Sequence, residues 1–226
     1  MTTNTYLRNS IITLLFLTPF VALVIATGLF FPYITGKAFM FRTLIEIAFV
    51  LYAILALRAP EFRPRLTSVF LAFVTFIGVI LVADIFGVYP FKSFWSNFER
   101  MEGFITHLHL FAYFIMLGAL FTGEKIWTRF FQTSLAVSVL IGLIGLNPDK
   151  MLDGRIFSQL GNSSYLGIYM LFHIFIAGFL LVRVIERKGD AAMKWLAGLT
   201  YGAVILFNFY IFYNTCLLYT SPSPRD

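Results

Sequence analysis

Charged residues are scarce in this chain of 226 residues. They make up 12% of the sequence, whereas an ordinary soluble domain carries about 25%. Hydrophobic residues make up 59%, which also excludes a disordered chain, because such a chain lacks the apolar residues needed to collapse. Cysteine is equally rare. The one cysteine, Cys216, can form neither a disulfide framework nor a metal cluster.

Several familiar sequence patterns are missing as well. The chain has no P-loop, no dinucleotide-binding fingerprint and no nucleophile elbow, and no run of alternating charge suggests a voltage sensor. The alternation of apolar and polar residues that marks a transmembrane barrel is also absent. We attribute the net charge of +6 to membrane topology rather than to nucleic-acid binding, so no nucleic-acid partner is expected.

What the chain does contain is long, continuous apolar runs. A membrane-crossing helix needs about 20 predominantly apolar residues. Seven runs approach this length, near residues 11–31, 39–57, 66–86, 104–121, 130–146, 164–182 and 195–213. They predict an all-α, polytopic helical membrane protein with about seven transmembrane helices. The first run is too long for the apolar core of a signal peptide, so we expect it to be a retained span.

The distribution of Lys and Arg predicts the orientation of these spans, because basic residues concentrate in cytoplasmic loops. One set of helix ends carries ten basic residues, namely Arg8, Arg58, Arg63, Arg65, Lys125, Arg129, Arg183, Arg187, Lys188 and Lys194. The other set carries six, namely Lys37, Arg42, Lys92, Arg100, Lys150 and Arg155. We therefore expect the N-terminus in the cytoplasm and the second set of ends on the outer face.

The last eleven residues, 216–226, differ from the rest of the chain. They interrupt an apolar run and end in a Ser-Pro-Ser-Pro-Arg-Asp sequence. They resemble the in-frame translation of a transposase adapter used in short-read sequencing. We therefore expect residues 216–226 to be an artefactual tail, and the natural protein to continue beyond Thr215. A natural polar tail is the alternative.

Ionisable residues inside the second run are the first candidate site. Arg42 and Glu46 lie one helical turn apart, so they share a face and can pair. Each ionisable group in a span costs at least about 2.5–3.5 kcal/mol on insertion scales, which favours a functional role. In the alternative interpretation, Lys37 and Arg42 extend to lipid headgroups and Glu46 merely neutralises Arg42.

A second candidate site lies in the loop after the third run. Arg100 is flanked by Glu99 and Glu102, which would hold its guanidinium in a fixed orientation suited to bidentate binding of a diphosphate. Asp84 could serve the same site or cap a helix end. The aromatic residues of this loop could instead form an interfacial belt.

Arg155 and Asn162 precede the sixth run. Asn162 or Ser163 is a plausible helix N-cap, and the amide groups there favour an anion. A plain capped helix is the alternative.

The three histidines do not predict a metal site. His107 and His109 are two residues apart, about 200° around a helix, so they cannot face one metal. One of the two could face the bundle interior as a base. We expect His173 to hydrogen-bond a neighbouring helix.

Three segments carry a family resemblance. Residues 31–42, residues 84–103 and residues 154–167 resemble the bacterial O-antigen ligase and O-antigen polymerase family, and the likeness covers nearly all of residues 8–215. Many members have Gly-Asn-Pro-Asn where this chain has Gly161-Asn162-Ser163-Ser164, which is a departure. The resemblance makes residues 1–215 the N-terminal part of a membrane-embedded ligase-like domain.

The resemblance implies a function. Members are multi-pass enzymes of the bacterial inner membrane. On the periplasmic face they transfer a glycan from an undecaprenyl diphosphate carrier to a lipid, a protein or a growing polymer, in lipopolysaccharide and related polysaccharide biosynthesis. No metal or other cofactor is expected. Arg100 and Arg155, supported by Lys37 and Arg42, would bind the diphosphate, and Glu99, Glu102, Glu46, Asp84 and Asn162 would orient them.

The resemblance also implies that this sequence is an incomplete enzyme. The family's Thr/Ser-Arg-Gly motif would follow Asn214-Thr215, and its catalytic histidine lies further on, so we expect the fragment to be inactive. The alternative function is a polytopic transporter that uses intramembrane Arg, Glu and His. A transporter should show internal repeats with broken helices, and no second copy of the Arg42–Glu46 pattern is found.

Overall fold

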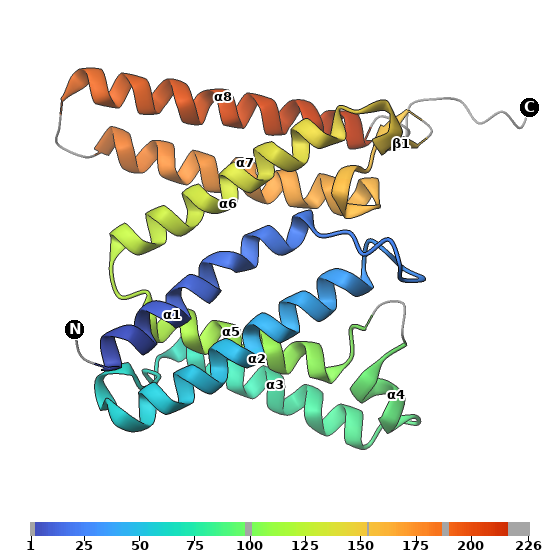
Figure 1. Cartoon of the computed structure of the whole chain (residues 1–226), viewed down its shortest axis with the longest axis vertical. Coiled ribbons are helices and arrows are strands. Elements are labelled where there is room, and N and C mark those ends of the chain that lie inside the picture. Colours follow the sequence, from blue (N-terminus) through green and yellow to red (C-terminus); the bar gives the residue numbers. More distant parts are fainter. Residues whose placement is uncertain (1–2, 98–100, 153, 187–189, 217–226) are drawn as a thin grey trace, which may run out of the picture. The chain divides into compact units, whose positions relative to one another are not determined.

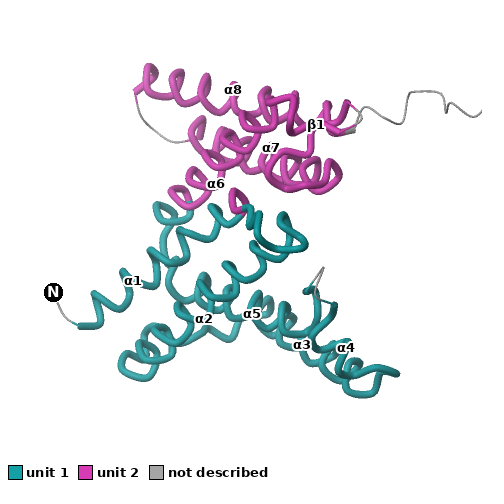
Figure 2. Tube along the Cα trace, turned by 45° about the vertical axis from the view of Figure 1, so that its right-hand side comes forward, with its two compact units in different colours: residues 1–21, 25–127 teal, residues 22–24, 128–226 magenta. Residues whose placement is uncertain are grey.

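The computed structural model describes residues 3–97, 101–152, 154–186 and 190–216, and these are overwhelmingly helical (Figure 1). The chain divides into two compact units (Figure 2). Unit 1 comprises residues 1–21 and 25–127, and unit 2 comprises residues 22–24 and 128–226.

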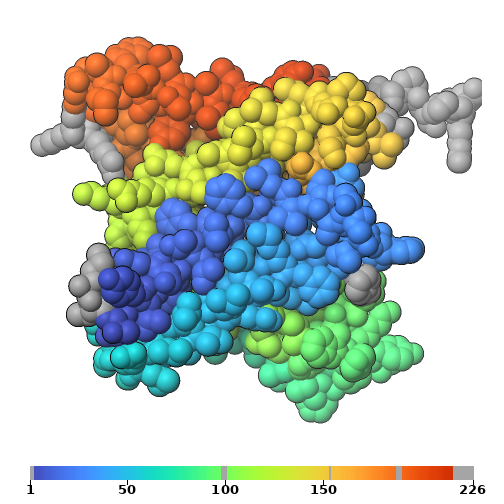
Figure 3. All heavy atoms as spheres, viewed as in Figure 1, coloured from blue at the N-terminus to red at the C-terminus, as the bar shows by residue number. Residues whose placement is uncertain are grey.

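Unit 1 is built from helices that lie side by side. It contains α1 (Thr3–Leu17), the 3-10 helix η1 (Thr18–Leu23, whose last two residues fall in unit 2), α2 (Thr35–Arg58), η2 (Pro60–Phe62), α3 (Ser68–Ile85), the short α4 (Pro90–Trp95) and α5 (Phe104–Leu120). Helices α1 and α2 lie against each other (Figure 3). Rings on α5 pack against Phe73 of α3, with centroids 5.3 Å away for Phe111 and 5.0 Å for Phe114.

Unit 2 has its core where three helices meet a small hairpin. It contains most of α6 (Glu124–Gly145), then η3 (Pro148–Lys150), β1 (Met151–Leu152), β2 (Arg155–Ile156), η4 (Ser158–Leu160), α7 (Ser163–Glu186) and α8 (Ala191–Cys216). The cluster of buried apolar residues there consists of Val137, Ile141, Ile156, Leu166, Met170 and Ile211. The antiparallel β1–β2 pair was not predicted from the sequence. It turns at Gly154, whose φ of +74° suits glycine.

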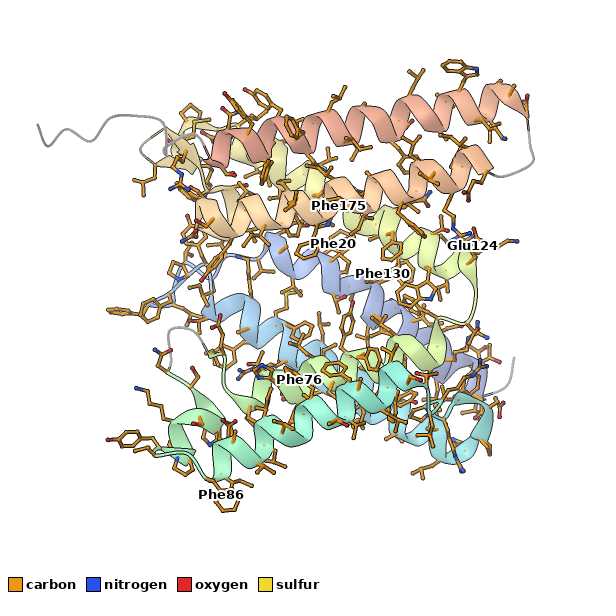
Figure 4. The ribbon with its side chains drawn as sticks, turned by 180° about the vertical axis from the view of Figure 1, so that it is seen from behind. Phe20, Phe76, Phe86, Glu124, Phe130 and Phe175 are labelled. Atoms are coloured by element: carbon orange, nitrogen blue, oxygen red, sulfur yellow. The ribbon has the colours of Figure 1, made fainter. Side chains whose placement is uncertain are left out.

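The lengths and compositions of the helices fit an all-α polytopic protein. Among the described residues, six helices are long and apolar enough to cross a membrane: Thr3–Leu23, Thr35–Arg58, Ser68–Ile85, Glu124–Gly145, Ser163–Glu186 and Ala191–Thr215. The predicted fourth span is α5, an apolar helix of 17 residues, which is shorter than the others. Large apolar side chains project outward, as Phe86 does beyond the end of α3 (Figure 4). Outward-facing apolar side chains on long helices are what lipid, rather than water, tolerates.

The first helix differs from the prediction. The sequence predicts a span near residues 11–31, but the helical segment begins at Thr3, tightens into a 3-10 helix at Thr18 and ends at Leu23. Pro19 gives the reason, because proline has no backbone N–H and its ring clashes with the carbonyl of the preceding turn. Hydropathy identifies the apolar stretch but does not show where the α-helix within it ends.

Glycines on α6 and α7 let α8 approach closely. A Cβ added at Gly142 would lie 2.5 Å from Phe207 Cε1 and 3.2 Å from Ile211 Cγ1. A Cβ added at Gly167 would lie 2.9 Å from Thr215 Oγ1. Small residues at such contacts are how membrane helices pack without a hydrophobic driving force.

Gly142→Ala is expected to lower the free energy of unfolding of unit 2 by up to about 2 kcal/mol. Overpacking costs about 1–3 kcal/mol, while the better helix propensity of alanine returns about 1 kcal/mol. Thermal unfolding in detergent measures this effect. Gly178→Ala on α7, where an added Cβ meets nothing within 4 Å, is the matched control. Equal melting temperatures for the two variants would contradict the close α6–α8 contact.

Candidate functional site

Lys37 is held at the first turn of α2. Its Nζ donates a hydrogen bond to Tyr33 O at 2.9 Å and lies 5.8 Å from the centre of the Tyr33 ring. The side chain is half-buried. Lys37 therefore lies at one end of a candidate span, which is compatible both with anion binding and with an interfacial anchor.

Arg42 links α2 to the segment that precedes α5. Its Nη2 donates to Met101 O at 2.6 Å and to Thr106 Oγ1 at 2.7 Å. The Thr106 hydroxyl in turn donates to Met101 O. Arg42 thus fixes the end of the loop that the sequence assigns to the outer face. Thr106 was not identified from the sequence, because a lone threonine near a helix start carries no distinctive signal.

The loop between α4 and α5, which contains Arg100, has residues with unusual backbone conformations. Glu99 and Arg100 lie outside the described residues. Ser96 and Met101 adopt positive φ values of 61° and 54°, which non-glycine residues seldom do. Glu102 is exposed. Residues with positive φ therefore lie on either side of the predicted diphosphate-binding segment.

Asp84 lies in the last turn of α3 and is half-buried. The suggestion that it caps this helix end is wrong, because the carbonyl groups there need donors and a carboxylate only accepts. A negative charge in the last turn is also unfavourable to the helix dipole. Among the described residues, no hydrogen bond or ion pair involves the Asp84 carboxylate.

Glu46 does not pair with Arg42 as the spacing on α2 predicts. Within 4.0 Å, its ion-pair partner is His109 on α5, with 3.0 Å between Glu46 Oε1 and His109 Nε2. The guanidinium of Arg42 is directed instead to the backbone and hydroxyl acceptors before and within α5. Helical spacing shows which residues share a face, but the neighbouring helix decides which of them pair.

Arg155 belongs to unit 2 and lies in β2. Its Nε donates to Thr215 O at 2.8 Å, in the last turn of α8. A cation hydrogen-bonded to the last carbonyls of a helix stabilises them and complements the dipole. One donor of this predicted diphosphate ligand therefore has a structural role.

Asn162 is the N-cap of α7, one of the two positions that the sequence predicts. Its Oδ1 accepts hydrogen bonds from Ser164 N at 2.8 Å and Tyr165 N at 3.4 Å. These are two of the amide groups that an anion at this helix start would use. The cap therefore favours the plain structural interpretation over anion binding at this position.

Asn162→Ala is expected to destabilise unit 2 by about 1 kcal/mol, because two amide groups of α7 lose their acceptor. Asn162→Asp, which keeps an acceptor at the same position, is the control and should unfold at nearly the same temperature as the wild type. Thermal unfolding in detergent measures both variants. A fall as large for Asn162→Asp as for Asn162→Ala would contradict the capping role.

The histidines are separated as the helical spacing predicts. His109 contacts α2, whereas the ring of His107 lies 6.3 Å from that of Phe76 on α3. His173 meets its predicted neighbouring helix, with 2.8 Å between its Nε2 and Ser134 Oγ on α6. Its Nδ1 lies 2.7 Å from Tyr169 O and therefore carries the hydrogen, so Nε2 accepts from Ser134 when the ring is neutral.

A second polar contact in unit 2 was not predicted. Asn208 on α8 is fully buried and donates from Nδ2 to Ser138 Oγ on α6 at 3.2 Å. An asparagine inside an apolar run was the available signal. This contact ties α8 to α6 through a hydrogen bond rather than through packing alone.

The candidate residues fall into two groups. Lys37, Arg42 and Glu46 belong to unit 1, and Arg155 and Asn162 belong to unit 2. Unit 1 brings the start of α2 and the end of the loop that contains Arg100 into direct contact. Comparison of the chain with models of protein families, with curated proteins and with solved structures finds no match.

Proposed function

We propose that this chain is part of a bacterial inner-membrane enzyme of the O-antigen ligase and polymerase type. In this proposal the seven helices α1, α2, α3, α5, α6, α7 and α8 cross the membrane, with the N-terminus in the cytoplasm. The enzyme transfers or polymerises a glycan carried on undecaprenyl diphosphate at the periplasmic face. The acceptor is a lipid, a protein or a growing glycan.

The observation that carries this proposal is the link made by Arg42. Its bonds to Met101 O and Thr106 Oγ1 hold the end of the outer loop against α2. Lys37 lies less than two turns before Arg42 on the same helix. Two cationic groups of α2 thus lie at the end of unit 1 where the end of the outer loop contacts this helix, as binding of an anionic headgroup requires.

The proposed chemistry follows from charge. When the bond between glycan and carrier breaks, extra negative charge develops on the departing diphosphate. Fixed guanidinium and ammonium groups stabilise that charge more in the transition state than in the ground state. The acceptor must lose a proton to a general base, which the family resemblance places after residue 215 together with a further arginine. The part described here would then bind the carrier without being active alone.

A transfer assay tests the function. The full-length protein, reconstituted in vesicles, receives an undecaprenyl diphosphate-linked glycan with a labelled sugar and a mixture of acceptors. The proposal expects label on an acceptor and release of undecaprenyl diphosphate without added metal. Passage of the intact glycan–lipid across the vesicle, with no label transferred, would instead indicate a transporter.

Labelling tests the orientation separately. With Cys216 replaced by serine, Lys92→Cys should react with a membrane-impermeant maleimide in bacteria whose outer membrane is permeable to it. Glu61→Cys, in η2, should react only after the inner membrane is broken. The opposite pattern would move the candidate loop to the cytoplasm and would remove the proposed access to a periplasmic glycan.

A further inference from the structure

The segment that follows α3 exposes large apolar side chains within ten residues of sequence. Phe86 is 84% exposed, Phe91 78% and Trp95 53%. Val88 and Tyr89, which connect α3 to α4, are exposed as well. A contiguous apolar patch of this kind on a protein marks a surface that contacts something other than water. The proposed glycan transfer uses none of these side chains.

Helix α4 is held by its backbone and by Phe94, while two of its rings stay exposed. The Phe94 ring lies 5.0 Å from that of Phe104 at the start of α5. The backbone of α4 is so close to Gly103 that a Cβ added there would lie 2.7 Å from Phe94 C. Phe91 and Trp95 are four residues apart and therefore neighbour each other on the helix surface. The exposed rings are thus presented by a fixed helix.

The covalent connection to α3 sets the depth of this segment. If α3 crosses the membrane, as the proposed function assumes, its last residue, Ile85, lies at the edge of the hydrocarbon core. Phe86 follows directly, and α4 begins at Pro90. The headgroup region beyond the core is only about 5–8 Å thick on each side. Because α4 packs against both α3 and α5, it stays near this level.

The composition of the exposed surface fits lipid rather than another part of a protein. Where helices of this chain pack closely, small residues make the contact, as at Gly142 and Gly167. The same preference is general for helix contacts in membranes. The exposed surface of residues 86–95 instead presents large rings, those of Tyr89, Phe91 and Trp95. Tyr and Trp are enriched where a membrane meets water.

The charge of Lys92 favours the same interpretation. Lys92 is exposed on α4 beside Phe91, and among the described residues no carboxylate lies within 4.0 Å of its ammonium group. An apolar protein surface laid over α4 would bury this charge without a partner, which is costly. A lipid interface covers the rings and still leaves a long Lys side chain in the hydrated headgroup region.

We propose that residues 86–95 form an interfacial anchor, which inserts Phe91 and Trp95 into the boundary between lipid headgroups and acyl chains at the end of α3. Rings that combine an apolar body with a polar edge are suited to this boundary. The proposal depends on the membrane placement of α3 and not on glycan transfer. Since α4 packs on Gly103, the anchor also fixes the depth at which the loop between α4 and α5 ends.

Fluorescence quenching of Trp95 tests the proposal. In the full-length protein, Trp127, Trp195 and any tryptophan beyond residue 215 are replaced by phenylalanine, and the protein is reconstituted in phosphatidylcholine vesicles. Bromine near the headgroup end of the acyl chains quenches shallow rings, bromine near the methyl end quenches deep rings, and iodide quenches rings in water. Shallow bromine is expected to quench Trp95 about twice as strongly as deep bromine, because an interfacial face lies about 5–10 Å into the boundary.

Three variants serve as comparisons. Phe76→Trp, made with Trp95→Phe, places the only tryptophan at the exposed centre of α3, where deep bromine should quench more strongly than shallow bromine. Phe91→Ser removes apolar area beside Trp95, so iodide quenching of Trp95 should rise about twofold as insertion weakens. Ser93→Ala, on the same helix, should leave all three quenching values unchanged.

Each other outcome contradicts the interfacial anchor in a different way. Strong quenching of Trp95 by iodide alone would place the segment in water. Weak quenching by all three quenchers would show that protein covers the ring, whether unit 2, the chain beyond residue 215 or another subunit. Stronger shallow than deep quenching in the Phe76→Trp protein would show that α3 does not cross the membrane. The transfer assay measures the proposed glycan transfer independently of these results.

Discussion

Replacing Arg100 by alanine is expected to lower glycan transfer by the full-length protein by about a hundredfold or more. Under the proposed function, Arg100 faces the negative charge that develops on the diphosphate, and loss of one preorganised donor of this kind typically costs a factor of 10² to 10³. The rate of label transfer, measured at a saturating concentration of carrier-linked glycan, reports this loss. Carrier binding should weaken less than the rate falls, since the charge grows in the transition state.

Two further variants separate a specific role from a general charge effect. Arg100→Lys keeps the charge but loses the planar fork that binds two oxygens at once, so it should recover part of the rate. Lys92→Ala removes one positive charge from an exposed position on α4 and should change the rate less than twofold. If Lys92→Ala slows transfer as much as Arg100→Ala, net charge rather than a diphosphate site is responsible.

Gly103→Ala is expected to destabilise unit 1 by about 3 kcal/mol. An added Cβ would overlap Phe94 O and would lie 2.7 Å from Phe94 C and 2.8 Å from Ser93 O. These are backbone atoms, so no side-chain rotation relieves the clash, and the effect should reach the upper part of the usual range for overpacking. The φ of Gly103 is −74°, so the cause is space rather than conformation. Thermal unfolding in detergent measures the change.

Gly118→Ala, within the helix α5 that Gly103 precedes, provides the control. There an added Cβ meets nothing within 4 Å, and alanine has the better helix propensity. This variant should be as stable as the wild type or slightly more stable. A Gly103→Ala protein with wild-type stability would show that α4 is not held against the start of α5, where the rings of Phe94 and Phe104 lie 5.0 Å apart.

The rate of glycan transfer by Gly103→Ala also tests whether the loop positions Arg100. Gly103 and Met101 lie at the end of the loop that contains Arg100, and Arg42 donates a hydrogen bond to Met101 O. If the loop positions Arg100, Gly103→Ala should lower glycan transfer in the fraction of protein that remains folded. Thr106→Val, which removes one acceptor of Arg42, should have a smaller effect in the same direction, and Thr106→Ser should restore it.

The sequence by itself determined the helical architecture. Long apolar runs with few charges form helices because a helix satisfies the hydrogen bonds of its own backbone polar groups. It also limited the N-cap of α7 to Asn162 or Ser163, since that interaction is local to one helix start, and the structure places it at Asn162. The sequence did not reveal that Pro19 ends the first helix early or that residues 151–156 form a hairpin. Both depend on backbone geometry that hydropathy does not measure.

Only the tertiary structure decided which polar groups meet. Helical spacing suggested that Arg42 pairs with Glu46, but Arg42 bonds Met101 and Thr106, and Glu46 meets His109 on another helix. Likewise, Arg155 reaches the end of α8, which is 60 residues away in the chain. A hydrogen bond depends on distances of about 3 Å, and for groups on different helices those distances are set by packing, which a linear pattern of residues does not contain.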